Sequence, residues 1–123
     1  MAKEDLKREI QSLYQAADGG MGLAQLVDGI CHTLQKHEDA LRGITYSYRL
    51  CASDTGYSRG FSLRDGHFAE TGEYDEADAV VTGTEENLLA IFRRQISPMS
   101  ALLRGKIKLK GSKAALIRFS EFL

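Results

Sequence analysis

Few residues of this chain are of the types that usually mark a chemical function. Its 123 residues include no tryptophan, one proline, two cysteines and three histidines. Cys31 and Cys51 form no CxxC or CxxH pair, which predicts two free, structural thiols in a reducing compartment rather than a zinc site or a disulfide. No apolar run approaches the roughly 18 residues of a membrane span, and the N-terminus lacks the apolar stretch of a signal peptide. We therefore expect one cytoplasmic domain over residues 1–123.

The histidines form no recognisable catalytic or metal site. His32 and His37 are five residues apart on a predicted helix, so they point about 140° apart. Asp28 shares a face with His32, but two ligands are too few for a structural zinc. His67 lies beside an Asp-Gly turn, and the chain has no GxSxG motif to mark a nucleophile. We expect no catalytic residue, no metal and no cofactor, and therefore no enzyme.

Two further clusters are weak matches to known sites. The glycines of residues 19–22 follow a predicted helix rather than a strand, so they indicate a helix–helix turn and not a dinucleotide-binding loop. Asp75, Glu76 and Asp78 fall in one turn and could contact a cation weakly. That turn lacks the glycine and the distal glutamate of a calcium loop.

The segment SPMSALLRGKIKLKG, residues 97–111, is the most informative part of the chain. Ser97 is a favourable N-cap, Pro98 suits the first position of a helix, and Gly105 ends that helix. Residues 106–110 then alternate between lysine and aliphatic side chains, which predicts a strand with its lysines in water. The apolar residues expected to face the interior are Met99, Leu102, Leu103, Ile107 and Leu109.

Hydrophobic periodicity divides the rest of the chain into helices and strands. Helices are predicted over residues 2–17 and 22–38, strands over residues 43–51, 57–63, 67–72 and 77–83, and further helices after Thr84 and Ser112. Turn signals at residues 54–56 and 64–66 should join the first three strands into an antiparallel meander. The predicted order is ααββββααβα.

The net charge of −1 hides a strong asymmetry along the chain. Residues 65–86 contain eight acidic side chains and no lysine or arginine, whereas residues 93–123 contain eight basic side chains and one glutamate. The basic part could meet anionic lipid headgroups, nucleic acid or a phosphorylated ligand. The alternative is a solvated face that the acidic segment offsets.

One family combines these elements in this order. The run ADAVVTG at residues 77–83, a helix containing LLAI, and then SPMSALLRGKIKLKGSKAALIRF resemble the C-terminal half of the sterol carrier protein type 2 family. The resemblance is close over residues 75–122 and extends to residues 43–72 in pattern only. It implies an α/β (α+β) fold, in which helices cover one face of a five-stranded, mainly antiparallel sheet above a hydrophobic tunnel. Residues 1–22 have no clear counterpart, and we expect them to form an added helix that covers the tunnel or contacts another subunit.

Members of that family bind fatty acids, fatty acyl-CoA, sterols or phospholipids without catalysing a reaction. The resemblance therefore implies non-catalytic binding and intracellular transfer of a lipid. The alternative is an accessory subunit that holds a lipophilic intermediate, such as a quinone precursor, for a partner enzyme. Eight side chains are expected to line the tunnel: Phe61, Leu63, Leu89, Phe92, Ile96, Met99, Leu103 and Phe119.

A carrier must also reach a membrane to deliver its lipid. We expect a transient contact with anionic membrane or a phosphate-bearing headgroup through Arg104, Lys106, Lys108 and Lys110, with the acidic residues 65–86 pointing away. Lysines that protect an edge strand from aggregation would explain the lysines but not the arginines. We expect no nucleic acid partner, and a homodimer remains open.

Overall fold

Five strands form a single sheet in the computed structural model, which describes residues 2–18, 22–72 and 76–122. The strands are β1 (Tyr46–Ala52), β2 (Ser58–Arg64), β3 (His67–Glu70), β4 (Ala79–Gly83) and β5 (Ile107–Gly111). Their order across the sheet is β3-β2-β1-β4-β5. β1 and β4 pair in parallel, and the other neighbouring pairs are antiparallel. The predicted meander and the mainly antiparallel sheet are therefore confirmed.

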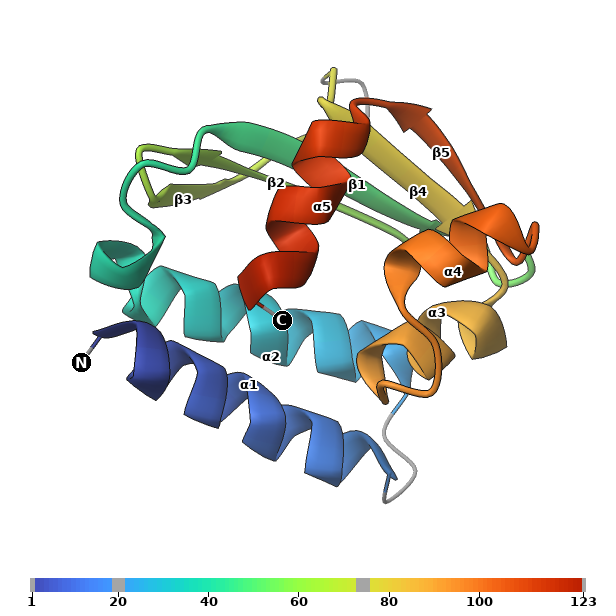
Figure 1. Cartoon of the computed structure of the whole chain (residues 1–123), viewed down its shortest axis with the longest axis horizontal. Coiled ribbons are helices and arrows are strands. Elements are labelled where there is room, and N and C mark those ends of the chain that lie inside the picture. Colours follow the sequence, from blue (N-terminus) through green and yellow to red (C-terminus); the bar gives the residue numbers. More distant parts are fainter. Residues whose placement is uncertain (1, 19–21, 73–75, 123) are drawn as a thin grey trace.

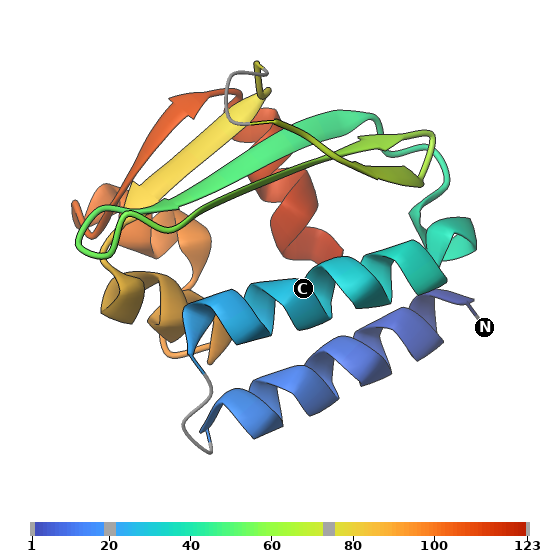
Figure 2. The ribbon, with the colours of Figure 1, turned by 180° about the vertical axis from the view of Figure 1, so that it is seen from behind.

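The helices cover one face of this sheet (Figure 1). They are α1 (Ala2–Asp18), α2 (Leu23–Lys36), the 3₁₀ helix η1 (Glu38–Leu41), α3 (Glu85–Phe92), α4 (Pro98–Leu103) and α5 (Lys113–Phe122). Both ribbon views place α1 on the side of α2 away from the sheet, as an additional layer (Figure 2). The predicted order of elements is confirmed, with η1 as an addition that is too short for hydrophobic periodicity to reveal.

Side-chain caps begin three of the helices, as their sequences indicate. The hydroxyls of Thr84, Ser97 and Ser112 each accept a hydrogen bond from a backbone N–H three residues later, at 3.2, 3.1 and 3.1 Å. Each cap satisfies a backbone donor that would otherwise lack a partner within its helix. These contacts determine where α3 begins after β4, where α4 begins after α3, and where α5 begins after β5.

The hairpin between β2 and β3 positions η1 against the sheet. Asp65 and Gly66 both have positive φ values, 50° and 84°, as a two-residue hairpin turn of this kind requires. A Cβ atom on Gly66 would lie 2.7 Å from the backbone oxygen of Glu38 in η1. The absence of a side chain at Gly66 therefore permits close contact between the hairpin and η1.

The core lies between the sheet and the helices because β1 and β2 present their large apolar residues to the same face. Tyr48 on β1 is directly opposite Phe61 on β2, and it pairs with Ala79 on β4 on its other side. All three are buried, at 6% exposure or less.

On the outer layer, a Cβ atom on Gly29 of α2 would lie 2.8 Å from Leu13 of α1, so this glycine allows the two helices to pack closely.

Candidate functional site

Two small apolar cavities lie between the sheet and the helices. Each has a volume of about 40 Å³. The first extends toward α2 and the second toward the junction of α3 and α4. Five side chains from the two central strands, α3 and α5 bound both cavities: Leu50, Val81, Phe92, Leu116 and Phe119.

An open groove adjoins the second cavity at the molecular surface. Its volume is about 370 Å³. Tyr14 of α1, Arg94, Ser97, Met99 and Ser120 contribute to its walls, together with Ile96. Ile91 and Pro98 bound the groove on one side and the second cavity on the other. These two residues therefore separate the surface groove from the interior.

The interior is closed compared with a site that holds a ligand. Pockets for small molecules usually have volumes of about 300–1,000 Å³, a range that the surface groove reaches and the two interior cavities do not. A cavity of about 40 Å³ has room for roughly one water molecule or methyl group. An acyl chain would have to separate the helices from the sheet to enter. The tunnel implied by the family resemblance therefore stays a prediction.

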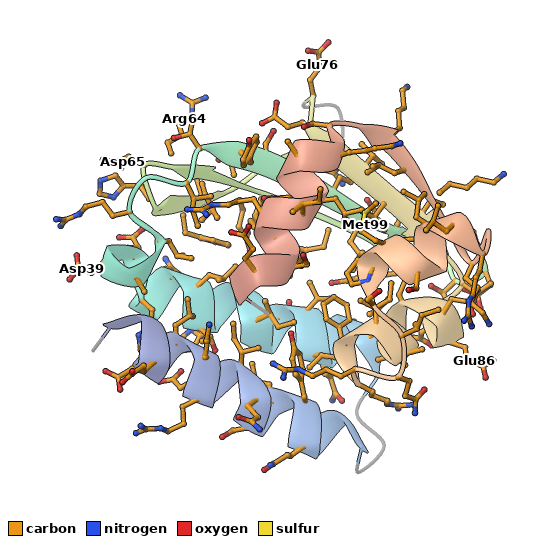
Figure 3. All side chains as sticks on the ribbon, viewed as in Figure 1. Asp39, Arg64, Asp65, Glu76, Glu86 and Met99 are labelled. Atoms are coloured by element: carbon orange, nitrogen blue, oxygen red, sulfur yellow. The ribbon has the colours of Figure 1, made fainter. Side chains whose placement is uncertain are left out.

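The residues expected to line the tunnel fall into four groups. Phe61, Phe92 and Phe119 bound the interior cavities. The rings of Phe61 and Phe119 pack against each other and against Tyr48, and the ring of Phe92 packs against Tyr14. Ile96 and Met99 line the surface groove instead, and Met99 is on the side of α4 that faces α5 (Figure 3). The remaining three divide into two buried side chains and one exposed: Leu63 is 1% exposed, Leu89 is 8% exposed, and Leu103 is 83% exposed.

The expected inward position of Leu103 is wrong. Ala101, at 0% exposure, is the buried centre of α4. Leu103 follows it by two positions, which turns its side chain by about 200° to the opposite side of the helix. Leu102 is half-buried, so α4 does not present its three large apolar residues on one face. On β5, Ile107 is buried as expected and Leu109 is half-buried.

Sequence reasoning missed Leu50, Val81 and Leu116 as cavity residues. Leu50 and Val81 are directly opposite each other in the parallel pairing of β1 with β4. Alternation along β1 predicts the face that Leu50 occupies, whereas Val81 follows another valine. Only the pairing of distant strands places the two together. Leu116 lies on the apolar side of α5, which crosses above this pair.

An arginine closes the end of the first cavity that faces α2. Arg59 of β2 forms ion pairs with Asp28 of α2 and with Glu70 of β3. Its side chain is 25% exposed, whereas both carboxylates are mostly exposed. The pairs connect α2 to the sheet beside the cavity, and they neutralise the guanidinium there.

The histidines contact single acidic side chains or solvent. His37 Nε2 lies 3.1 Å from Glu9 Oε1, His67 Nδ1 lies 3.7 Å from Glu38 Oε1, and His32 is exposed. Among the described residues, no group of three or more histidine, cysteine or acidic side chains is placed to hold a metal ion. Asp75 and residues 19–21 lie outside the described part of the chain. Asp78 uses its carboxylate to accept a hydrogen bond from the backbone of Ser47 at 2.8 Å.

The two cysteines are free, as predicted. Cys31 is buried at 3% exposure, and this burial raises the pKa of its thiol to about 11. Cys51 is half-buried on β1. A thiol with so high a pKa is a poor nucleophile near neutral pH, so Cys31 serves the packing of α2.

The basic residues of the last third are at the surface, as expected. Arg104, Lys106, Lys108 and Lys110 are all exposed. The acidic segment is not wholly on the opposite side, however. Asp65 and Glu86 lie at opposite sides of the molecule (Figure 3), and Asn87, next to Glu86, donates a hydrogen bond to the backbone oxygen of Lys106 at 3.0 Å.

Solved structures with the same fold come from several kinds of protein. An inverting sec-alkylsulfatase from Pseudomonas sp. gives a TM-score of 0.67 at 21% identity, covering 80% of this chain but only 16% of the sulfatase. Palmitated SCP2L2 from Aedes aegypti gives 0.61 at 19% identity, covering 82% of this chain and 93% of that one. The ubiquinone synthesis protein UbiJ-SCP2 gives 0.52 at 20% identity, with coverages of 72% and 75%. These likenesses show the fold.

Membership of a family comes from the sequence itself. Comparison with curated proteins gives no match. Among the described residues, no helix combines the length and the hydrophobicity needed to cross a membrane. The sequence model of the SCP-2 sterol transfer family matches residues 23–123, which leaves α1 outside the match. This chain, with its helix-covered sheet and apolar interior, belongs to the SCP-2 sterol transfer family.

Proposed function

We propose that this chain is a non-catalytic carrier that binds the apolar part of a lipid between its sheet and its helices. The observation that supports this most strongly is a series of three adjoining spaces that lead from the surface to the apolar interior. The surface groove, of about 370 Å³, shares Ile91 and Pro98 with the second cavity. That cavity shares five side chains with the first. Small outward movements would join the three spaces into one tunnel.

The expected ligands are fatty acids, fatty acyl-CoA, sterol-like molecules or phospholipids. Each buried methylene contributes about 0.8 kcal/mol, so ten would contribute about 8 kcal/mol. This gain must exceed the cost of association and of separating the helices. Affinity should therefore rise with chain length. Discrimination between chains that differ by one methylene should be weak, because apolar contacts distinguish close homologues poorly.

The test compares two neighbouring positions on α5. Leu116, 4% exposed, bounds both interior cavities, whereas Ile117 is 45% exposed. We expect Leu116→Phe to fill interior space and to reduce uptake of a fluorescent fatty acid severalfold. Ile117→Phe should leave uptake unchanged. Equal uptake by both variants, with both folded as judged by circular dichroism, would place the acyl chain elsewhere.

A second candidate is an accessory subunit that holds a lipophilic intermediate, such as a quinone precursor, for a partner enzyme. The structural likeness to UbiJ-SCP2, a ubiquinone synthesis protein, favours this alternative. Lipid extraction from protein purified from its native host separates the two candidates. A carrier should yield acyl lipids, whereas an accessory subunit should yield a prenylated ring compound together with a stoichiometric enzyme. Homodimerisation, a further expectation, is measured by light scattering.

We also propose that Arg104, Lys106, Lys108 and Lys110 dock the carrier on anionic membrane. All four are exposed, and Leu103 beside them is 83% exposed, which provides an apolar contact within a basic surface. Each basic residue near anionic lipid contributes about 1 kcal/mol before salt screening. Transfer to anionic vesicles should exceed transfer to neutral vesicles at low salt, and the Lys106/Lys108/Lys110→Gln variant should reduce the difference. Equal rates on both vesicle types, insensitive to salt, would contradict docking.

A further inference from the structure

The wall of the surface groove contains an arginine in an unusual backbone conformation. Arg94 has a backbone φ of 59°, in a left-handed region that residues other than glycine seldom occupy. This conformation directs its guanidinium over the ring of Tyr14, with 5.5 Å between the guanidinium carbon and the ring centroid. Among the described residues that line the groove, Arg94 carries the charge. Its guanidinium therefore places hydrogen-bond donors and a positive charge in the groove wall.

Tyr14 adds an unused hydrogen-bond donor to the same wall. The residue is 5% exposed, and its hydroxyl oxygen is buried without a hydrogen-bond partner among the residues that the structure describes. Burial raises the pKa of Tyr14 well above its ordinary value, so the hydroxyl keeps its proton. Buried hydroxyls nearly always have a partner, so an unpartnered one beside a groove points to an acceptor that enters from outside.

The rest of the groove is suited to an amphipathic molecule. Ser97 accepts a hydrogen bond from the backbone of Ser100 at 3.1 Å, which leaves its own hydroxyl proton available to donate. Ile91, Ile96 and Met99 supply apolar surface in the same groove, and Ile91 also bounds the second cavity. The polar groups therefore lie in the surface space from which the proposed function leads an acyl chain inward.

We propose that this groove binds the anionic headgroup, a carboxylate or a phosphate, of a single-chain lipid whose tail passes between Ile91 and Pro98 into the interior. The proposal rests on the proposed function, because the interior must accept the tail. Arg94 would form charge-assisted hydrogen bonds with the anion, and the hydroxyls of Tyr14 and Ser97 would donate to it.

This headgroup site depends on the helix that precedes the family match. Tyr14 belongs to α1, whereas the family model begins at residue 23. The N-terminal helix thus has a specific role in the proposal: it supplies one donor and the aromatic ring that holds Arg94 over the groove. This role is distinct from covering the tunnel, since α1 lies on the side of α2 away from the sheet (Figure 1).

The experiment measures partition of three labelled lipids from phosphatidylcholine vesicles into the full chain. Palmitate carries a carboxylate, single-chain lysophosphatidate carries a phosphate, and hexadecanol has a similar chain with no charge. We expect Arg94→Gln to weaken binding of at least one of the two anions about tenfold and to leave hexadecanol unchanged. The anion that responds identifies the headgroup.

Three variants complete the comparison. Tyr14→Phe should weaken binding of the same anion by about fivefold, because it removes one donor and keeps the ring. Arg94→Lys should recover part of the loss, because it keeps the charge but not the planar pair of donors. Arg64→Gln, which removes an exposed arginine outside the groove, should change none of the three affinities. Thermal midpoints confirm that each variant is folded.

The two levels of the proposal fail in different ways. If the parent protein takes up none of the three lipids, the proposed function is wrong. If it takes up all three, and Arg94→Gln changes none of them or weakens hexadecanol as much as the anions, the headgroup site is wrong while the carrier function stands. Loss of anion binding in Arg64→Gln equal to that in Arg94→Gln would also overturn the site.

Discussion

Tyr48 on β1 donates a hydrogen bond from its hydroxyl to the backbone carbonyl of Ala115 on α5, at a distance of 2.8 Å. The two residues are 67 positions apart, and both are buried. The bond joins the centre of the sheet to the helix that carries Leu116 and Phe119, two of the residues that bound both cavities. It therefore fixes the height of α5 above the sheet, and with it the volume of the interior.

Removing this hydroxyl should loosen α5. Tyr48→Phe removes this hydrogen bond while the carbonyl of Ala115 stays within the helix α5, so we expect the free energy of unfolding to fall by about 0.5–1.5 kcal/mol. Tyr46→Phe, two residues earlier on the same face and half-buried, provides the matched control and should cost less. Urea denaturation measures both. Equal losses in the two variants would show that the Tyr48–Ala115 bond adds little.

Tryptophan substitutions distinguish the packed interior from the surface groove. Phe92 is 5% exposed and bounds two cavities of about 40 Å³, so Phe92→Trp should overfill the core and cost about 1–3 kcal/mol of stability. Met99 is half-buried and lines the groove of about 370 Å³, so Met99→Trp should cost little. Each variant would contain a single tryptophan, because the chain has none. Its fluorescence then reports ligand binding directly.

The order of these two costs is the critical observation. A larger loss of stability in Met99→Trp than in Phe92→Trp would contradict the assignment of Met99 to the groove and Phe92 to the core.

The contact between the β2–β3 hairpin and η1 can be tested with two glycines. Gly66 and Gly56 have similar positive φ values, 84° and 76°, so alanine is strained at either position by about 1 kcal/mol. A Cβ atom at Gly66 would also collide with the backbone of η1, whereas one at Gly56 has nothing within 4 Å. We therefore expect Gly66→Ala to lower the thermal midpoint distinctly more than Gly56→Ala. Similar midpoints would argue against close packing of η1.

Thiol reactivity tests the burial of α2. Because burial raises the pKa of Cys31 to about 11, only about one thiol in a thousand is ionised at pH 8. Cys31 should react far more slowly with a disulfide reagent than Cys51, and its rate should keep rising between pH 8 and pH 10. The measurement uses the single variants Cys31→Ser and Cys51→Ser. Equally fast modification of both thiols would indicate that α2 does not shield Cys31.

Local patterns predicted the elements well because caps, turns and periodicity act over a few residues. Ser97, Pro98 and Gly105 delimit α4 as expected, and the alternation at residues 106–110 becomes β5. Boundaries moved by a few residues elsewhere: the second helix ends at Lys36, and the fourth strand begins at Ala79. Backbone pairing and packing decide these ends, and the local sequence does not contain that information.

The site was less predictable because it depends on which elements meet. Phe92 and Phe119 were correctly expected to face the interior, since each lies on a strongly apolar helix face. Leu103 was also expected to face the interior, but it is exposed, because α4 is too short for the spacing of its apolar residues to identify the buried side. The groove between Tyr14 and Arg94 joins residues 80 positions apart, which no local pattern indicates. The cytoplasmic location and the homodimer stay predictions.

The most direct test of lipid carriage is native mass spectrometry of the chain purified without detergent, before and after incubation with palmitate. The account predicts a single additional mass that corresponds to one bound lipid, retained from the host or acquired from palmitate. It also predicts slower hydrogen exchange in α5 when the lipid is bound, because the tail packs against Leu116 and Phe119. Bare protein in both samples, together with unchanged exchange in α5, would contradict the central claim that the interior accepts an acyl chain.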